Sequence, residues 1–300
     1  MERTTMQTSR GKTWAGLHLA VLLAGGTGLF GRYISLSELP LVWYRILISL
    51  IVLAMLLALT GRLKRIPRSS AAAIAGCGGI LALHWVFFYG SIQASNVSVG
   101  VVCFATTGFF TAWLDPWINH RRVSVAEILI SLVAIAGILL IFALDIRFRT
   151  GILLGLLSSA LYALFAICNV RCAAATGAES TTMLLYELAG GIALLTLLLP
   201  LYALFRPATP LIPDRRDLAA LVVLSAVFTI LPYLLQIHAL KHLSAFSVNI
   251  TYNLEPVYSI LLAALIFGEG REVGPSFWAG VALIVISVFL QTLRSLKKSA

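Results

Sequence analysis

The stretch "YNLEPVYS" (252–259) places a glutamate directly before a proline inside one of the most apolar parts of the chain. A carboxylate in hydrocarbon is costly, and a proline removes a backbone donor and crowds the preceding turn of a helix. Pro256 would release the carbonyl of Tyr252 from its helical partner, close to Asn253 and Glu255. These groups could line a polar cavity. The alternative is that Glu255 is a structural group, tied by hydrogen bonds to neighbouring helices.

A second candidate lies in "LHWVFFYGS" (83–91), where a histidine stands among aromatic residues. On a helix Phe88 shares the face of His84, and Trp85 and Tyr89 form a second stripe beside it. An aromatic cavity with few polar groups suits an amphipathic metabolite. The alternative is a neutral, buried histidine whose aromatic neighbours serve packing.

Other polar groups also fall inside apolar runs: Arg45, Thr106, Tyr162 and Tyr233, the last directly after Pro232. Arg45 lies about seven residues inside its run. It could anchor a substrate carboxylate, act as a gate, or extend outward to the membrane interface. Thr106, Tyr162 and Tyr233 are candidates for substrate binding because each lies near the middle of a run. Pro232 allows a bend beside Tyr233.

The remaining chemistry-bearing residues form no catalytic or metal-binding set. The five histidines are scattered over different runs, and Cys168 and Cys172 share a helix face without a further ligand nearby. We interpret the cysteines as small core residues. The phosphate-binding pattern G-x-x-x-x-G-K-[ST] does not occur, which argues against ATP hydrolysis by this chain. We therefore expect no catalytic residue, cofactor or metal.

The composition indicates which solvent surrounds these groups. The 300 residues are 60% hydrophobic and 11% charged, with a mean hydropathy of +0.96, whereas a soluble domain carries about 25% charged residues. The solvent is therefore a lipid bilayer. The net charge of +10 lies mostly in short loops and at the termini, so nucleic acid is not an expected partner.

A spanning helix needs about 20 mostly apolar residues, and the chain offers ten such runs. They lie near 14–34, 39–60, 71–91, 97–118, 124–144, 151–171, 181–205, 218–239, 243–267 and 273–293. With the N-terminus inside, cytoplasmic segments hold 14 lysines and arginines and the opposite segments hold 7. This bias places both termini in the cytoplasm, as an even number of spans also requires.

The ten spans contain an internal repeat. "LVWYRILISLIVLAMLL" (41–57) resembles "MLLYELAGGIALLTLLL" (183–199), with Arg45 opposite Glu187, and "IQASNVSVG" (92–100) resembles "ALKHLSAFS" (239–247). The expected fold is an all-α integral membrane protein of two five-helix repeats, 1–150 and 151–300, within one domain. An odd number of spans per half makes the repeat inverted, which favours transport, although duplicated halves also occur in membrane proteins that transport nothing. Inversion also argues against a direct Arg45–Glu187 pair.

These features resemble the drug/metabolite transporter superfamily, in particular its EamA-type exporters. The resemblance rests on the ten spans, "YRILIS" around Arg45, "ALKHLSAFSVNITYNLEPVYSILLAALIFGE" (239–269) and Gly280. It implies a secondary exporter of the bacterial inner membrane. Spans one, three, four, six, eight and nine would form the walls of a cavity at the membrane midplane, and spans five and ten would be peripheral. The aromatic amino-acid exporter group is the subgroup it suggests, and a homodimer is a compatible assembly. Span four departs from the pattern, since no proline stands near Thr106; a bend elsewhere is expected there.

The resemblance favours amino acids, including aromatic ones, moved by alternating access. The runner-up is a nucleotide-sugar or organic-anion exchanger of the same superfamily, which would need more buried cations than Arg45. An integral membrane enzyme would need clustered catalytic groups, and a passive channel a continuous polar stripe. Transport could be coupled to protons through Glu255 or His84, or could be facilitated diffusion.

Overall fold

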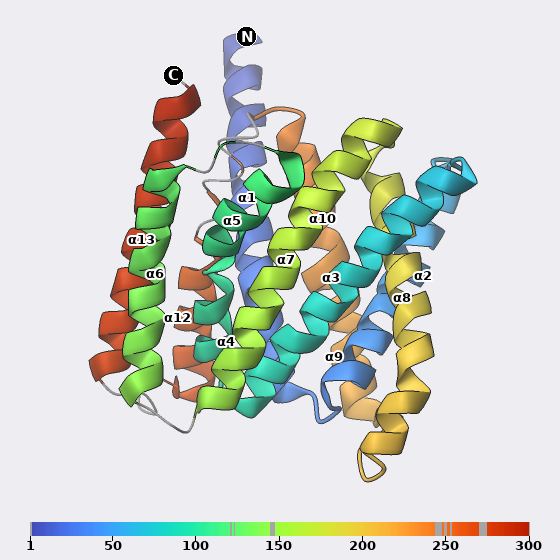
Figure 1. Cartoon of the computed structure of the whole chain (residues 1–300). Helices are drawn as coiled ribbons and strands as arrows, with labels where there is room; N and C mark the ends of the chain where they lie inside the picture. The colour runs from blue at the N-terminus through green and yellow to red at the C-terminus, as the bar shows by residue number, and fades with distance from the viewer. Residues whose placement is uncertain are drawn as a thin grey trace.

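The computed structural model describes residues 2–120, 122, 124–144, 148–243, 248, 251–252, 254–269 and 275–299. Within this part of the chain every regular element is helical, and the helices stand side by side as one bundle (Figure 1). Both termini lie at the same end of the bundle, as an even number of crossings requires (Figure 1).

The helices follow one another with short connections. The first half contains α1 (Glu2–Tyr33), α2 (Glu38–Leu59), α3 (Arg68–Ala94), α4 (Val97–Phe104), α5 (Thr107–Asn119) and α6 (Val125–Leu144). The second half contains α7 (Arg149–Thr176), α8 (Ser180–Phe205), α9 (Arg215–Ser225), a π-helical segment (Ala226–Ile230), α10 (Leu231–Leu240), α12 (Glu255–Phe267) and α13 (Pro275–Ser299).

Seven described stretches are long and apolar enough to cross a membrane, counting α4–α5 as one and α9–α10 as one. Shorter apolar helices lie at Ile128–Gly137, Glu255–Phe267 and Trp278–Ser287. They coincide with the three remaining runs that the sequence predicts, near 124–144, 243–267 and 273–293. The all-helical membrane fold is thereby confirmed.

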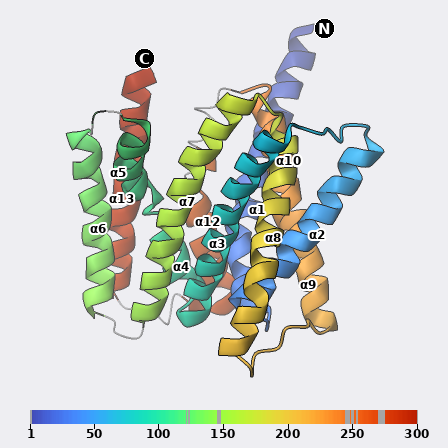
Figure 2. The same cartoon turned by 45° about the vertical axis from the view of Figure 1, so that its right-hand side comes forward.

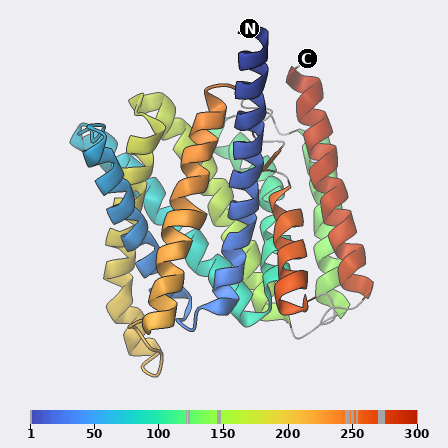
Figure 3. The same ribbon diagram turned by 180° about the vertical axis from the view of Figure 1, so that it is seen from behind.

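The packing separates a central group of helices from a peripheral pair. α3 makes its largest contacts with α7 and α8, so it joins the two halves. α1 packs between α10 and α12 (Figure 3). α6 and α13 pack mainly on each other at one edge of the bundle (Figure 2). These two helices are spans five and ten, which the resemblance places at the periphery.

Small residues let α3 and α8 approach until their backbones touch. A Cβ atom added at Gly78 would collide with the backbone of Glu187, and one at Gly190 would collide with the backbone of Ala75. In lipid, where apolar burial alone does not drive helices together, such close contact is a main source of packing energy.

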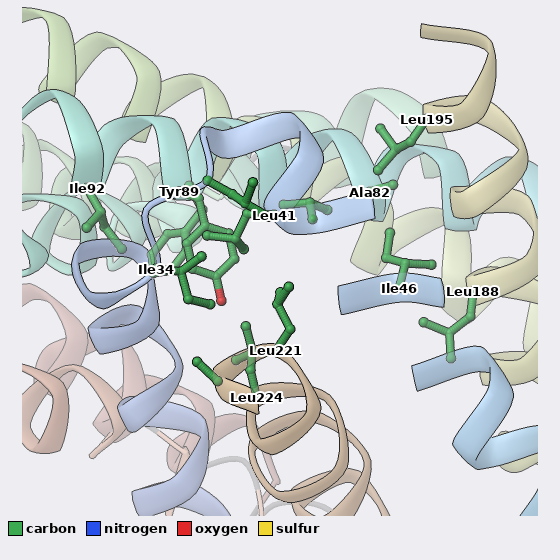
Figure 4. Close-up of a cluster of buried hydrophobic side chains, with 14 of the residues drawn as sticks. Ile34, Leu41, Ile46, Ala82, Tyr89, Ile92, Leu188, Leu195, Leu221 and Leu224 are labelled. Carbon is green, nitrogen blue, oxygen red and sulfur yellow. The ribbon is translucent and has the colours of Figure 1, made fainter. Parts of the chain in front are cut away.

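The largest buried apolar cluster also spans the two halves (Figure 4). It contains Leu41 and Ile46 of α2, Tyr89 of α3, Leu188 of α8 and Leu224 of α9. Tyr89 is fully buried, and its hydroxyl is the polar atom that this cluster presents in the close-up (Figure 4).

Span four is broken even though it contains no proline near the break. α4 ends at Phe104 and α5 begins at Thr107. The hydroxyls of Thr106 and Thr107 donate to the carbonyls of Cys103 and Phe104, each at 2.6 Å, which satisfies backbone groups that the break frees. The expectation that this span bends elsewhere is therefore wrong.

Span nine is interrupted before its glutamate. α12 begins at Glu255, and Pro256 occupies its first turn, where the missing N–H of a proline costs little. Pro256 therefore begins a helix instead of kinking one, and both halves carry a break at the corresponding span.

Span eight contains the π-helical segment, which ends two residues before Pro232. Proline cannot donate a hydrogen bond to the preceding turn. Thr229 donates from its hydroxyl to the carbonyl of Leu224, five residues earlier, at 2.8 Å. Single π-helical turns inside α-helices are frequent at functional sites.

Candidate functional site

His84 of α3 is held by Ser158 of α7. The His84 Nδ1 atom lies 2.9 Å from the Ser158 carbonyl oxygen, and the Ser158 hydroxyl lies 3.1 Å from the carbonyl oxygen of His84. The ring therefore donates from Nδ1, with the tautomer assigned from this geometry, and the hydroxyl donates in return. Nε2 then carries a lone pair, and it accepts no hydrogen bond from the described residues. His84 is both a link between the halves and an available acceptor.

An aromatic group surrounds the His84 ring. The centroids of Tyr162, Phe104 and Phe88 lie 4.9, 5.2 and 6.1 Å from it. His84, Phe88 and Tyr162 were predicted from the sequence as site residues. Phe104 was not, because a phenylalanine in an apolar helix carries no distinguishing signal. The break after α4 places Phe104 against Tyr162, with their centroids 5.0 Å apart.

Arg45 of α2 lies inside the bundle and does not extend to the interface. Only 4% of it is exposed. Its Nε donates to the hydroxyl of Thr229 at 3.1 Å, and its Nη1 donates to the hydroxyl of Tyr89 at 3.0 Å. The guanidinium also lies over the Trp85 ring, 4.1 Å from the centroid, which is a favourable cation–π distance.

The partners of Arg45 come from both halves of the chain. Tyr89 and Trp85 belong to α3, whereas Thr229 belongs to the π-helical segment. The Tyr89 hydroxyl in turn donates to the carbonyl of Thr27 in α1 at 3.3 Å. Thr229 was not predicted, because threonine is common in membrane helices. Its only sequence signal is its place three residues before Pro232.

Glu255 begins α12 and is partly exposed. Among the described residues it accepts no hydrogen bond and forms no direct ion pair. Its carboxylate nevertheless lies within electrostatic range of the Arg45 guanidinium. Gly25 lets α1 pack closely on the start of α12, since a Cβ at Gly25 would lie 2.9 Å from the Glu255 carbonyl oxygen.

The other predicted residues lie apart from these groups or act locally. Tyr233 donates from its hydroxyl to the carbonyl of Ser180, at the start of α8, at 2.9 Å. Thr106 is 1% exposed and bonds within the break of span four. Asn253 lies outside the described residues. Pro232 follows the π-helical segment, and Pro256 lies in the first turn of α12.

A second buried charge, Glu187 of α8, has its own partner. Glu187 is 3% exposed and accepts a hydrogen bond from Asn169 of α7. Arg45 and Glu187 do not pair, as the inverted repeat predicts. The residues that come together are thus His84, Phe88, Phe104 and Tyr162 on one side, and Arg45, Trp85, Tyr89 and Thr229 on the other, with Glu255 within electrostatic range.

Apolar helices that account for ten crossings, with charged side chains held among them, define a polytopic membrane protein. Residues 13–143 and 149–293 each match the profile of the EamA-like transporter family. The chain therefore belongs to this family, within the drug/metabolite transporter superfamily, and is a membrane transporter with two repeats. The two matched regions meet between residues 143 and 149.

A solved structure with TM-score 0.61 has the same fold as the chain. It is 18% identical, and the alignment covers 95% of this chain and 98% of that one. A comparison with curated proteins found no match.

Proposed function

We propose that this transporter exports small amphipathic metabolites, namely amino acids including aromatic ones, by alternating access. We place it in the bacterial inner membrane, as the family resemblance suggests. The positive charges in alternate loops favour both termini in the cytoplasm. The observation that carries the substrate class is that Arg45 and Glu255 carry opposite charges near the centre of the bundle without pairing with each other.

Arg45 is suited to bind a carboxylate. A guanidinium has five N–H groups in a planar fork, and two of them are used by described residues. These two bonds and the Trp85 ring fix its orientation, so the remaining donors are held ready for a ligand. A bidentate bond to a carboxylate is among the stronger hydrogen-bonding arrangements in proteins.

Glu255 is suited to bind the ammonium group of the same ligand. Its carboxylate is not used by described residues, and it lies at a helix break, where transporters of inverted-repeat design hold their substrates. A zwitterion between Arg45 and Glu255 would neutralise both charges. An anion would be attracted by Arg45 but repelled by Glu255, which favours amino acids over organic anions.

The aromatic group supplies the apolar part of the site. His84, Phe88, Phe104 and Tyr162 present ring surfaces from α3, α4 and α7, and the Nε2 atom of His84 adds one acceptor. A flat apolar side chain could pack against these rings with offset or edge-on geometry. The two halves would then rock about this region, since both contribute to it.

The test is counterflow of labelled phenylalanine in proteoliposomes, with and without a pH gradient. We expect exchange with unlabelled phenylalanine, and much weaker competition by phenethylamine and phenylpropionate, which each lack one charged group. Arg45→Ala and Glu255→Gln should abolish counterflow, whereas Arg68→Ala and Glu179→Gln, which change exposed residues, should not. Absence of exchange for every amino acid would refute the substrate class. Unchanged rates in the Glu255→Gln and His84→Ala variants would refute the site.

A further inference from the structure

Two cysteines from different halves of the chain face each other between α3 and α7. The Sγ atoms of Cys77 and Cys172 lie 3.4 Å apart. Cys77 is 5% exposed, whereas Cys172 is partly exposed and lies one turn before the end of α7. That end of α7 is also the end of the bundle that holds both termini (Figure 1). The sequence indicated only the Cys168–Cys172 relation on one helix, and the contact across helices comes from the fold.

The cysteine pair lies at one end of the seam between α3 and α7, along which further polar contacts join the halves. Towards the other end of α3, the Ser91 hydroxyl donates to the Gly151 carbonyl at 2.6 Å. His84 and Ser158 bond in the middle of the seam, and the two thiols meet beyond them. A covalent bond at this position would fix α3 of the first repeat to α7 of the second.

We propose that Cys77 and Cys172 are a reversible disulfide pair that a peroxide oxidises, and that the bond slows transport by joining the two repeats. The sulfurs need to approach from 3.4 Å to about 2.05 Å, a displacement that side-chain rotation in both residues can share. Disulfides in reducing compartments are transient and regulatory in most cases, which matches a pair at the end assigned to the cytoplasm.

The reaction proceeds in two balanced steps. The thiolate sulfur of Cys172 attacks one oxygen of hydrogen peroxide, the O–O bond breaks, and the leaving hydroxide takes up the thiol proton as water. The sulfur of Cys77 then attacks the resulting sulfenic acid of Cys172 and displaces its hydroxyl as a second water. Two thiols are oxidised and one peroxide is reduced to two waters. A dithiol restores both cysteines by thiol–disulfide exchange.

The bond can be observed independently of transport. The full-length protein in proteoliposomes is treated with dilute hydrogen peroxide, blocked with a maleimide and digested with trypsin. Cleavage after Arg171 separates Cys168 from Cys172, so mass spectrometry distinguishes the two. We expect a linked pair of peptides containing Cys77 and Cys172 in the wild type and in the Cys168→Ala and Cys103→Ala variants. Neither Cys77→Ala nor Cys172→Ala should give a linked pair.

The effect on transport rests on the proposed function. Phenylalanine counterflow should fall to the fraction of protein that is not linked, recover with dithiothreitol, and stay unchanged in peroxide-treated Cys77→Ala. No linked peptide in the wild type would overturn the proposal, as would linkage that leaves counterflow unchanged. Absence of counterflow before treatment would refute the substrate assignment alone, because the linked peptides would still report on the pair.

Discussion

At the scale of single residues, Tyr89 connects the buried arginine to the first helix, because its hydroxyl accepts from Arg45 and donates to Thr27. Tyr89→Phe keeps the ring but removes both bonds. A hydrogen bond to a charged group contributes about 1.5–3 kcal/mol. We therefore expect the apparent KM for counterflow to rise about tenfold or more. Tyr44→Phe, whose ring packs edge-on against Trp43, is the control. Equal KM values in the two variants would contradict this role of Tyr89.

Glu179 lies outside the membrane spans, before α8, and bonds Lys64 in the loop between α2 and α3 at 2.5 Å. This hydrogen bond and the Lys64 charge hold the pKa of Glu179 below its usual value. A carboxyl with a lowered pKa stabilises the fold above its ordinary pKa, and the contribution is lost as pH falls through the lowered value.

Exposed ion pairs contribute little and are screened by salt. Glu179→Gln should therefore lower the melting temperature slightly at neutral pH and low salt. The difference from wild type should vanish in acid and in high salt. A difference that grows as the pH falls would contradict a lowered pKa of Glu179 in the folded protein.

The residue types explain which parts of the candidate site can be found from sequence. Arg45 and Glu255 stand out because charges inside apolar runs are rare. Thr229 and Phe104 do not stand out, since their types are ordinary in membrane helices and only the fold brings them to Arg45 and His84. Which side chains pair across helices depends on the rotation of each helix about its axis and on its depth in the membrane. A single sequence constrains neither of these closely.

At the scale of helices, the break in span four shows why a proline is an incomplete signal. Thr106 and Thr107 return hydroxyl bonds to carbonyls three residues earlier. They end α4 without a proline. Threonines occur throughout apolar helices, so their presence does not predict such a break. Pro256, by contrast, lies in the first turn of α12, directly after the point where that helix begins.

Pro232 maintains the π-helical segment that presents Thr229 to Arg45. Pro232→Ala restores an N–H that can donate to the Phe228 carbonyl, so the segment can become regular α-helix and turn Thr229 away from Arg45. We expect counterflow to fall while helix content by circular dichroism stays unchanged. Pro275→Ala, at the first position of α13, should change neither measurement. Normal counterflow in Pro232→Ala would show that transport does not depend on Pro232 and the π-helical segment.

The α3–α8 contact makes a sharp prediction about two neighbouring glycines. Gly78→Ala places a methyl group against the backbone of Glu187, which cannot yield as a side chain would, whereas a Cβ at Gly76 meets nothing within 4 Å. Overpacking of this kind costs about 1–3 kcal/mol. We expect a clearly lower melting temperature in detergent for Gly78→Ala and an equal or higher one for Gly76→Ala. Equal melting temperatures would contradict backbone contact between the helices.

At the scale of the whole molecule, hydropathy predicts ten spans and their approximate limits, because the bilayer requires long apolar helices. The internal repeat predicts the two-part plan that the family match supports. Neither predicts the contacts that hold the halves together at each end. Glu269 is an example: it lies after α12, at the end of the bundle opposite the termini, and no sequence pattern indicates a partner for it.

Glu269 ties the second half to the first through a buried network. Its side chain is fully buried and forms an ion pair with Arg32 of α1 at 2.9 Å. It also accepts from the backbone N–H groups of Val97 and Ser98, at 3.0 and 2.9 Å, and from the Ser98 hydroxyl at 2.7 Å. A carboxylate at the N-terminus of α4 also interacts favourably with the helix dipole.

Breaking this network should open that end of the bundle more often. Glu269→Gln removes the charge that Arg32 and the α4 N-terminus stabilise, and its amide NH2 group would face N–H donors. In a cysteine-free background, Ser259→Cys places a thiol at a buried position in α12. We expect a membrane-impermeant maleimide, added on the Glu269 side, to label this cysteine several-fold faster in Glu269→Gln than in the parent.

Two comparisons make the labelling result decisive. Glu179→Gln makes the same chemical change at an exposed site towards the other end of the bundle, so it should leave labelling from the Glu269 side unchanged. Arg32→Ala should raise labelling, and adding it to Glu269→Gln should increase the rate less than additively, because the two residues share one interaction. If Glu269→Gln labels at the parental rate while circular dichroism shows an intact fold, Glu269 caps α4 without controlling access from that side.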